Sequence, residues 1–241
     1  MITGFFTAVF YQPLYNGLVF LFDVIPWANA GLVVILFTIL VKLILFPLSI
    51  KATYAQMEMK EIEADLRRIK EKYKDNKEQQ TLKTVELYKE KNINPFAGFF
   101  VLLIQLPIII ALYRVFLKSG LPTIDTTMLY HFVSAPAHIN MVFLWLADIS
   151  GKSIILAILA GMSTYFQIKY STPQDLSSGG EKSKQADMMK MFQTQMKYVF
   201  PVLVFFISWS ISAAVSLYWI TSNVFTIVQE LYMRKYVRKT V

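Results

Sequence analysis

Long apolar stretches alternate with charged segments along the chain. Four of them stand out, at residues 30–50, 96–116, 153–170 and 199–228. The first reads AGLVVILFTILVKLILFPLSI. That length is enough to cross a bilayer, because a crossing takes about 20 apolar residues. The pattern therefore predicts an all-α integral membrane protein.

The last apolar stretch is too long for one crossing. Residues 199–228 would extend about 45 Å as a single helix, against a hydrocarbon core of about 30 Å. We expect a break within Ser208–Ser212, which gives two short spans and five spans in all. Short spans tend to thin the bilayer around them.

Basic residues are unevenly shared between the segments outside these stretches. Residues 51–94 hold eleven Lys and Arg against nine Asp and Glu, whereas residues 1–41 hold no Lys or Arg and residues 117–152 hold only two. Basic loops stay on the cytoplasmic side of a membrane. We therefore expect the N-terminus outside and the C-terminus in the cytoplasm of a multi-pass protein of the cell inner (plasma) membrane. The net charge of +8 is thus interpreted as orientation rather than as nucleic-acid binding.

The first residues allow two interpretations. Residues 5–24 are apolar, but Gln12-Pro13 and Asn16-Gly17 interrupt them. We favour an amphipathic helix at the outer interface over a sixth span. The expected segments in chain order are an outer interfacial amphipathic helix (1–29), span 1 (30–50), a cytoplasmic charged helical hairpin (51–94), span 2 (95–117), an outer segment (118–152), span 3 (153–170), a cytoplasmic linker (171–197), short spans 4 and 5 (198–229) and a basic cytoplasmic tail (230–241).

The charged hairpin is predicted from helical spacing on either side of a turn at Asp75-Asn76. A short loop would suffice to connect two spans, so a partner-binding role is favoured over a simple connector. The apolar residues of its two expected helices are Ile62, Leu66, Ile69 and Tyr73, then Leu82, Val85 and Tyr88.

Lys42 is the only charged residue of the first apolar stretch. A Lys near the centre of a spanning helix costs roughly 2.5–3.5 kcal/mol, so such a residue suggests a functional site. The alternative is that its stem carries the ammonium about 10 Å to the nearer interface, close to Ser49. Gln105, Gln167 and Asn223 are polar residues in other spans. Gln105 and Asn223, together with Lys42, predict a hydrophilic surface at membrane depth, although polar side chains can also simply bond across helices.

The sequence carries no recognisable catalytic arrangement. It contains no cysteine, and His131 and His138 lack the ligand spacing of a zinc site. No glycine-rich phosphate loop is present, and nothing selects a serine as a partner of Lys42 for hydrolysis. We therefore expect neither enzymatic activity nor a cofactor or metal.

Several motifs occur in an order that resembles one known family, the YidC/Oxa/Alb membrane protein insertases, from about residue 5 to residue 236. The motifs are Val41-Lys42-Leu43-Ile44-Leu45-Phe46-Pro47-Leu48, Asn94-Pro95, Gln105-Leu106-Pro107-Ile108, Ala111-Leu112-Tyr113, Phe143-Leu144-Trp145-Leu146-Ala147-Asp148-Ile149-Ser150 and Leu217-Tyr218-Trp219-Ile220-Thr221-Ser222-Asn223. The resemblance implies five spans around a hydrophilic groove that opens to the cytoplasm and to lipid.

The resemblance also implies roles for particular residues. Lys42 takes the place of a basic groove residue that is usually arginine in the family, and Gln105, Gln167 and Asn223 fall at expected groove positions. Two further residues, Tyr218 and Trp219, resemble positions that contact the apolar segment of a substrate. The basic residues expected to contact cytoplasmic partners are Arg67, Arg68, Arg234 and Lys235.

The expected function is that of a membrane protein insertase and chaperone without enzymatic turnover. Its groove would receive hydrophilic tails of nascent membrane proteins and release their apolar segments into lipid. The implied partners are nascent chains, the ribosome and targeting machinery, a secretion channel and the lipid bilayer. One alternative is a small-solute (anion) transporter or channel, and another is a structural membrane subunit whose partner neutralises Lys42.

Overall fold

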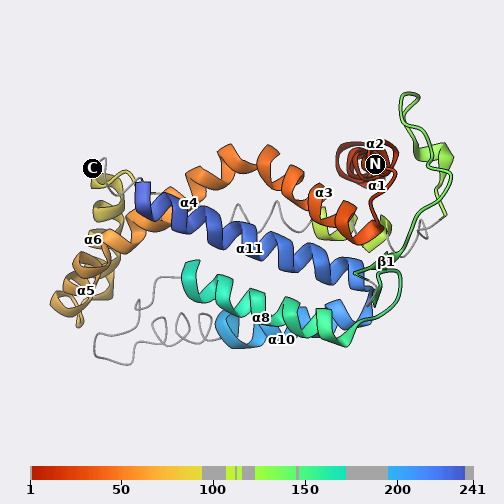
Figure 1. The fold of residues 1–241 in the computed structure, drawn as a ribbon. Helices are drawn as coiled ribbons and strands as arrows, with labels where there is room; N and C mark the ends of the chain where they lie inside the picture. The colour runs from red at the N-terminus through yellow and green to blue at the C-terminus, as the bar shows by residue number, and fades with distance from the viewer. Residues whose placement is uncertain are drawn as a thin grey trace.

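The fold is seen in a computed structural model, which describes residues 2–93, 107–111, 113–115, 123–144, 147–171 and 195–236. The described chain is mostly helical (Figure 1). Its elements are α1 (Ile2–Phe6), the π-helical η1 (Thr7–Tyr11), α2 (Gln12–Val24), α3 (Ala30–Ile44), α4 (Phe46–Glu61), α5 (Glu63–Lys72), α6 (Lys77–Glu90), the 3-10 turn η2 (Thr126–Met128), β1 (Val142–Phe143), β2 (Ala147–Asp148), α8 (Ile154–Ser171), the π-helical η3 (Gln195–Val199), α10 (Phe200–Ser210) and α11 (Ala213–Tyr236).

The first predicted span is not one straight helix. It begins at α3, where the side chain of Asn29 accepts a hydrogen bond from the amide of Leu32 at 3.0 Å. It is interrupted at Leu45, and α4 then continues in a different direction (Figure 1). The expectation of a continuous helix over residues 30–50 was therefore wrong. The cause is Pro47, whose nitrogen has no hydrogen to donate to the preceding turn.

The last apolar stretch forms two helices. The chain leaves helical geometry at Ile211 and Ser212, between α10 and α11, inside the stretch where the sequence predicts a break. α11 has 24 residues and continues past position 229, so it is longer than the predicted short helix. Its charged final turns are helical because backbone hydrogen bonds do not depend on apolar side chains.

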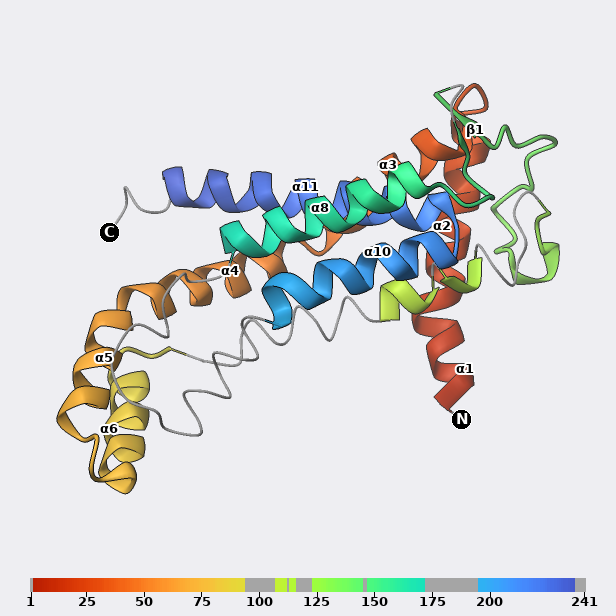
Figure 2. The same cartoon turned by 90° about the horizontal axis from the view of Figure 1, so that it is seen from below.

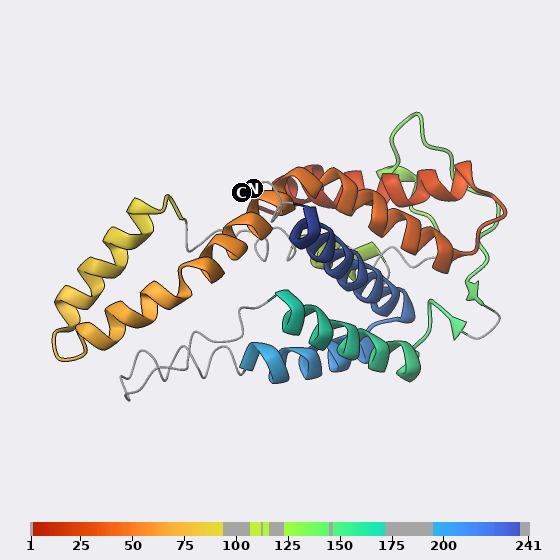
Figure 3. The ribbon, with the colours of Figure 1, turned by 60° about the vertical axis from the view of Figure 1, so that its left-hand side comes forward.

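α11 lies at the centre of the bundle. It packs against α8 on one side and α3 on the other, and α10 packs against α8 (Figure 3). The buried core includes residues from each of these helices, such as Phe37 of α3, Ala160 of α8, Val204 of α10 and Leu217 of α11. The residues expected to form the second span lie mostly outside the described part, and those described there, 107–111 and 113–115, are helical.

The N-terminal helices run across the bundle. α2 is seen nearly end-on in Figure 1, where α3, α8 and α11 run across the view, and Figure 2 shows it crossing them steeply. Gly4–Val24 is the one described helix that is both long enough and apolar enough to span a membrane. Ala30–Ile44 and Ile154–Tyr170 are apolar but shorter.

α5 and α6 pack side by side and project from the bundle (Figures 1 and 2). Asn76 starts α6 by accepting a hydrogen bond from the amide of Gln79 at 3.0 Å. The small core between these helices consists of Ile62, Leu66, Leu87 and Ile93, with Ile69 and Tyr88 packed against it. Leu82 and Val85, two of the apolar residues that the sequence places on the second hairpin helix, are exposed, whereas Leu87 of α6 is buried in this core.

A short antiparallel β-ribbon, which the all-α expectation did not include, covers the opposite end of the bundle. Phe143 of β1 pairs with Ala147 of β2. The ring of Phe143 lies against Gly31 of α3 so closely that a Cβ on Gly31 would overlap it. The carbonyls of Ile149 and Gly151 accept hydrogen bonds from the first amides of α11, at 3.1 and 2.8 Å. These bonds satisfy amides that have no partner inside the helix.

The segments gather at two opposite ends of the molecule. α2, η2 and the β-ribbon lie at one end, called here the ribbon end. α5, α6 and the last turns of α11 lie at the other, called here the hairpin end (Figures 1 and 2).

Candidate functional site

One face of α11 carries polar side chains inside the bundle. Ser222, Asn223, Thr226 and Gln229 recur at the spacing of one helix face and are here called the polar face of α11. All four are buried or half-buried. Polar side chains at such depth must find partners in neighbouring helices, because hydrocarbon offers none.

Asn223 joins α11 to α8. Its Nδ2 donates hydrogen bonds to Ser163 Oγ at 3.0 Å and to Thr164 Oγ1 at 2.8 Å. Both hydroxyls donate in turn to the carbonyl of Ala160, so their oxygens are free to accept. Ser163 lies near the middle of α8, which places this polar junction far from either end of the helix.

Lys42 joins α3 to α11. Its Nζ donates to Thr226 Oγ1 at 3.3 Å, and the Thr226 hydroxyl donates to the carbonyl of Ser222 at 2.9 Å. The lysine is half-buried, and among the described residues its hydrogen-bond partner is this neutral hydroxyl. A hydroxyl orients the ammonium without neutralising it. The arrangement therefore leaves a positive charge on the polar face, three residues or about 4.5 Å along α11 from Asn223.

A third contact lies further toward the hairpin end. The hydroxyl of Ser49, on α4, donates to Gln229 Oε1 at 2.9 Å. Ser49 and Lys42 both contact α11, so they lie on the same side of the kinked α3–α4 pair. Hydrogen-bonding side chains thus follow α11 from the middle of the bundle toward its charged last turns.

The predicted groove residues have different outcomes. Lys42 and Asn223 lie on neighbouring turns of this polar surface. Gln167 is half-buried on α8, one turn after the two hydroxyls that Asn223 contacts, and it has a partner of its own. Gln105 lies outside the described residues.

The residues predicted to meet an apolar substrate segment are buried. Tyr218 is 3% exposed and Trp219 is 6% exposed, and both belong to the main core. Burial here follows from the central position of α11, whose N-terminal half is covered by other helices all round.

The predicted partner-contact residues lie at the hairpin end. Arg68 is exposed on α5 and forms a 3.4 Å ion pair with Asp65, and Arg67 is half-buried with a partner of its own. Lys235 is exposed on the last turn of α11. The side chain of Arg234 lies outside the described residues.

Sequence reasoning missed three members of the polar surface: Ser49, Thr226 and Gln229. The available signal was spacing, since Ser222, Thr226 and Gln229 are four and three residues apart and lie on one helix face. In the part of the chain that the structure describes, no group of His, Asp and Glu side chains could hold a metal ion.

These features define a class: a helical membrane protein whose bundle encloses a polar surface, on which a lysine contacts a neutral hydroxyl among the described residues. The chain belongs to the family described as the 60Kd inner membrane protein, whose family model matches residues 20–240.

Similar curated proteins carry the name membrane protein insertase YidC. The one from Fusobacterium nucleatum is 31% identical over 207 residues, which cover 86% of this chain and 87% of the relative. The one from Clostridium perfringens is 33% identical over 236 residues, covering 96% and 89%. The relative from Francisella philomiragia is longer: 32% identity over 237 residues covers 94% of this chain but 38% of the relative.

Proposed function

We propose that this chain is a membrane protein insertase that receives the hydrophilic tails of nascent membrane proteins at the polar face of α11. Insertase function in the cell membrane follows from membership of the family and the names of its relatives. The function involves no covalent chemistry. The contacts of the polar face support the place and the manner in which a client protein is received.

The Lys42–Thr226 contact carries the proposal. A lysine at membrane depth is costly, and the partner of Lys42 among the described residues is a neutral hydroxyl at 3.3 Å, which does not compensate its charge. An acidic client tail would supply the missing negative charge. The adjoining amides and hydroxyls, with Asn223 foremost, would lower the cost of bringing other polar client groups into the bilayer, where each unpaired group costs several kcal/mol.

The proposed surface is hydrated and open to the cytoplasm. Its polar contacts follow α11 toward the hairpin end, where Ser49 meets Gln229, and this direction supports entry from that side. Gln105 and Gln167 are proposed to complete the surface. A client's apolar segment is proposed to reach Tyr218 and Trp219, and because both are buried, α11 and its neighbours must separate for that contact.

The proposed topology has five crossings, with the N-terminus outside and the C-terminus in the cytoplasm. The gathering of lysine-poor and basic segments at opposite ends of the molecule supports it. Gly4–Val24 is apolar enough to span, yet it runs across the other helices. We propose that it lies along the outer interface, as an amphipathic helix would.

The hairpin end is proposed to bind the ribosome, the targeting machinery and a secretion channel. The observation in favour is charge. α5, which carries Arg67 and Arg68, and the last turns of α11, which carry Arg234 and Lys235, lie at this end, and ribosomal RNA is polyanionic.

The test is insertion of a single-span reporter into liposomes that contain only the purified protein, read as protease-protected orientation. We expect insertion to rise with protein content. Lys42→Met should slow insertion of an acidic-tailed reporter about fivefold, the equivalent of about 1 kcal/mol, and a neutral-tailed reporter much less. Lys42→Arg should stay active because it keeps the charge.

Lys152→Met is the matched control, since it removes one exposed lysine from the segment between β2 and α8. An equal loss for acidic and neutral tails with Lys42→Met would refute the charge-pairing step. No insertion above protein-free liposomes, from folded protein, would refute the autonomous insertase.

A further inference from the structure

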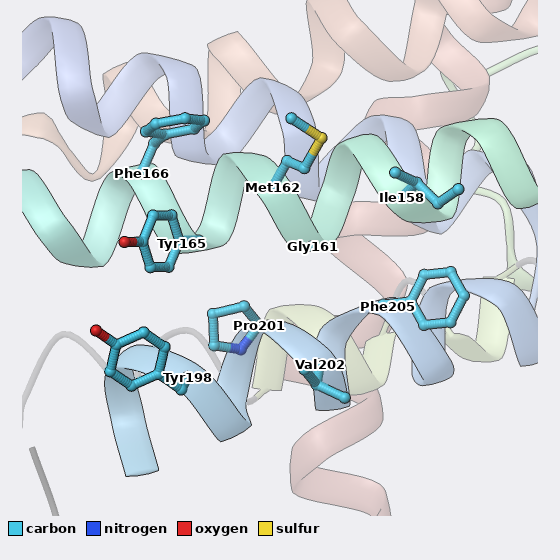
Figure 4. Close-up of a pocket in the computed structure, with 9 residues that line it drawn as sticks. All are labelled: Ile158, Gly161, Met162, Tyr165, Phe166, Tyr198, Pro201, Val202 and Phe205. Atoms are coloured by element: carbon cyan, nitrogen blue, oxygen red, sulfur yellow. The ribbon is translucent and has the colours of Figure 1, made fainter. Parts of the chain in front are cut away.

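A groove between α8 and α10 lies on a different surface from the polar face of α11. It is open to the surface and offers a space of about 440 Å³ with an almost entirely apolar lining, formed by Ile158 and Met162 of α8 and Val202 and Phe205 of α10, among others (Figure 4). Gly161 sets its depth. A Cβ there would lie 3.1 Å from the carbonyl oxygen of Pro201, so the two backbones nearly touch at the floor.

One end of this groove is polar. Tyr165 of α8 and Tyr198 of η3 face each other with ring centroids 6.1 Å apart, and both hydroxyls lie at this end (Figure 4). The other lining side chains carry no charged or hydrogen-bonding groups. The groove is therefore amphipathic along its length: apolar over most of it and hydroxyl-bearing at one end.

Two lysines flank the tyrosine end. Lys169 is exposed and follows Tyr165 by four residues, which places it one turn further on the same face of α8. Lys197 adjoins Tyr198 directly, and its Nζ lies 5.5 Å from the centre of that ring. An apolar trough that ends in hydroxyls and ammonium groups matches a ligand with an apolar chain and an anionic head.

We infer that the α8–α10 groove binds an anionic phospholipid, with one acyl chain in the trough and the phosphate between Lys169 and Lys197. Charge favours a lipid over a client helix. The hydroxyls of Tyr165 and Tyr198 and the ammonium groups of Lys169 and Lys197 suit an anionic head, whereas an apolar helix would leave them without a partner. A flexible acyl chain can lie along the whole trough.

This inference is independent of the proposed role of the polar face. The residues of α8 that meet Asn223 are Ser163 and Thr164, whereas those that line the groove are Gly161, Met162 and Tyr165. A variant of the groove therefore leaves the contacts of Lys42 and Asn223 in place.

The test is native mass spectrometry of the full chain in a non-ionic detergent, with added phosphatidylglycerol or with phosphatidylcholine of identical acyl chains. We expect one phosphatidylglycerol to bind more tightly than phosphatidylcholine by about tenfold, because lysines near a membrane surface favour anionic lipid. Lys169→Gln with Lys197→Gln should abolish that preference. Val202→Trp, which fills the trough and keeps both lysines, should weaken the binding of both lipids.

Lys77→Gln with Lys91→Gln is the matched control, since it removes two exposed lysines of the hairpin and causes the same change in net charge. The site is supported if this control keeps the preference for phosphatidylglycerol and the Lys169→Gln, Lys197→Gln variant loses it. Equal affinity for the two lipids, equal loss in both double variants, or displacement of bound phosphatidylglycerol by an apolar single-span peptide overturns it. Circular dichroism checks that each variant is folded.

Discussion

The two ends of the molecule are held together by different kinds of interaction. At the ribbon end, backbone groups bond directly across elements, as between Ala30 and Asn140 at 2.8 Å and between Ala213 and Gly151 at 2.8 Å. At the hairpin end, α5 and α6 rest on a small apolar core, and the ion pairs Arg68–Asp65 and Lys83–Glu86 are exposed. Exposed ion pairs contribute about 0–1 kcal/mol each, so that end depends on a few buried side chains.

The difference suggests that the ribbon end is built to stay closed and the hairpin end to open. On the proposed topology the ribbon end faces outward, so a closed ribbon end would keep the membrane sealed, while a hairpin with little core can separate or rearrange when a partner binds. The polar face of α11 runs between these two regions. Substitutions at either end test whether the ribbon end and the hairpin end unfold independently of each other.

The largest expected effect is on the hairpin. Leu66→Ala removes a side chain that is 4% exposed in a small core, which should destabilise the α5–α6 pair by about 2–4 kcal/mol. Amide hydrogen exchange should then show loss of protection in α5 and α6 and unchanged protection in α8 and α11.

Leu82→Ala is the control on the same hairpin, because Leu82 is 57% exposed and its truncation leaves no cavity. If Leu66→Ala also reduced the amide protection of α8 and α11, the two ends would unfold as one cooperative unit. That result would contradict their energetic separation.

The next effect is at the contact between α3 and β1. Gly31→Ala places a methyl group against the ring of Phe143, and overpacking of this kind costs about 1–3 kcal/mol. Thermal unfolding in detergent should register the loss, and a second change, Phe143→Leu, should recover part of it.

Gly4→Ala serves for comparison, since a Cβ at that position meets nothing within 4 Å and alanine favours a helix. Equal stability of the Gly31 and Gly4 variants would show that the ribbon adjusts easily.

A somewhat smaller effect is expected at Asn16, which ties α2 to the segment around η2. Its Nδ2 donates to the carbonyl of Met128 at 2.9 Å, and its Oδ1 accepts from the amide of Tyr130 at 2.6 Å. Asn16→Ala leaves that amide without this partner, at a cost of about 1–2 kcal/mol. Limited proteolysis should cleave residues 123–144 faster. The exposed Asn140→Ala, which loses only a local bond to Val142, should not show this.

The smallest effect concerns pH at the ribbon end. The side chain of Ser150, and then its amide, bond to the Asp148 carboxylate and hold its pKa below the ordinary value. A lowered folded-state pKa stabilises the fold above the ordinary pKa of about 3.9, and that contribution disappears as the pH falls through the lower value. Amide exchange at Ser150 should accelerate only in this acidic range. Asp148→Asn should abolish the pH dependence, and a variant that kept it would point to another group.

The pattern of residues predicts several features of the fold because they depend on local properties. The turn near Asn76 and the break between α10 and α11 fall where the sequence places them. The interruption at Leu45 does not follow from apolar length, because it depends on the backbone chemistry of Pro47. The inward side of α6 was misjudged because several apolar residues offered alternative faces.

For the candidate site, the sequence identified which residues are anomalous and the structure identified their partners. Lys42 is a charged residue and Asn223 a polar residue, and each lies within an apolar stretch. Their contacts with Thr226 and Ser163 join residues 184 and 60 positions apart, which no helical spacing relates.

The sequence by itself determined the membrane class, the family resemblance and the alternation of apolar and charged segments, since hydrophobic length and charge add up residue by residue along the chain. Tertiary structure alone decided which hydroxyl meets Lys42, that Tyr218 and Trp219 are covered, and that Ile149 and Gly151 supply the carbonyls that bond to the start of α11. The physical reason is that pairing and burial depend on which helices become neighbours, and that is settled by packing across the whole bundle.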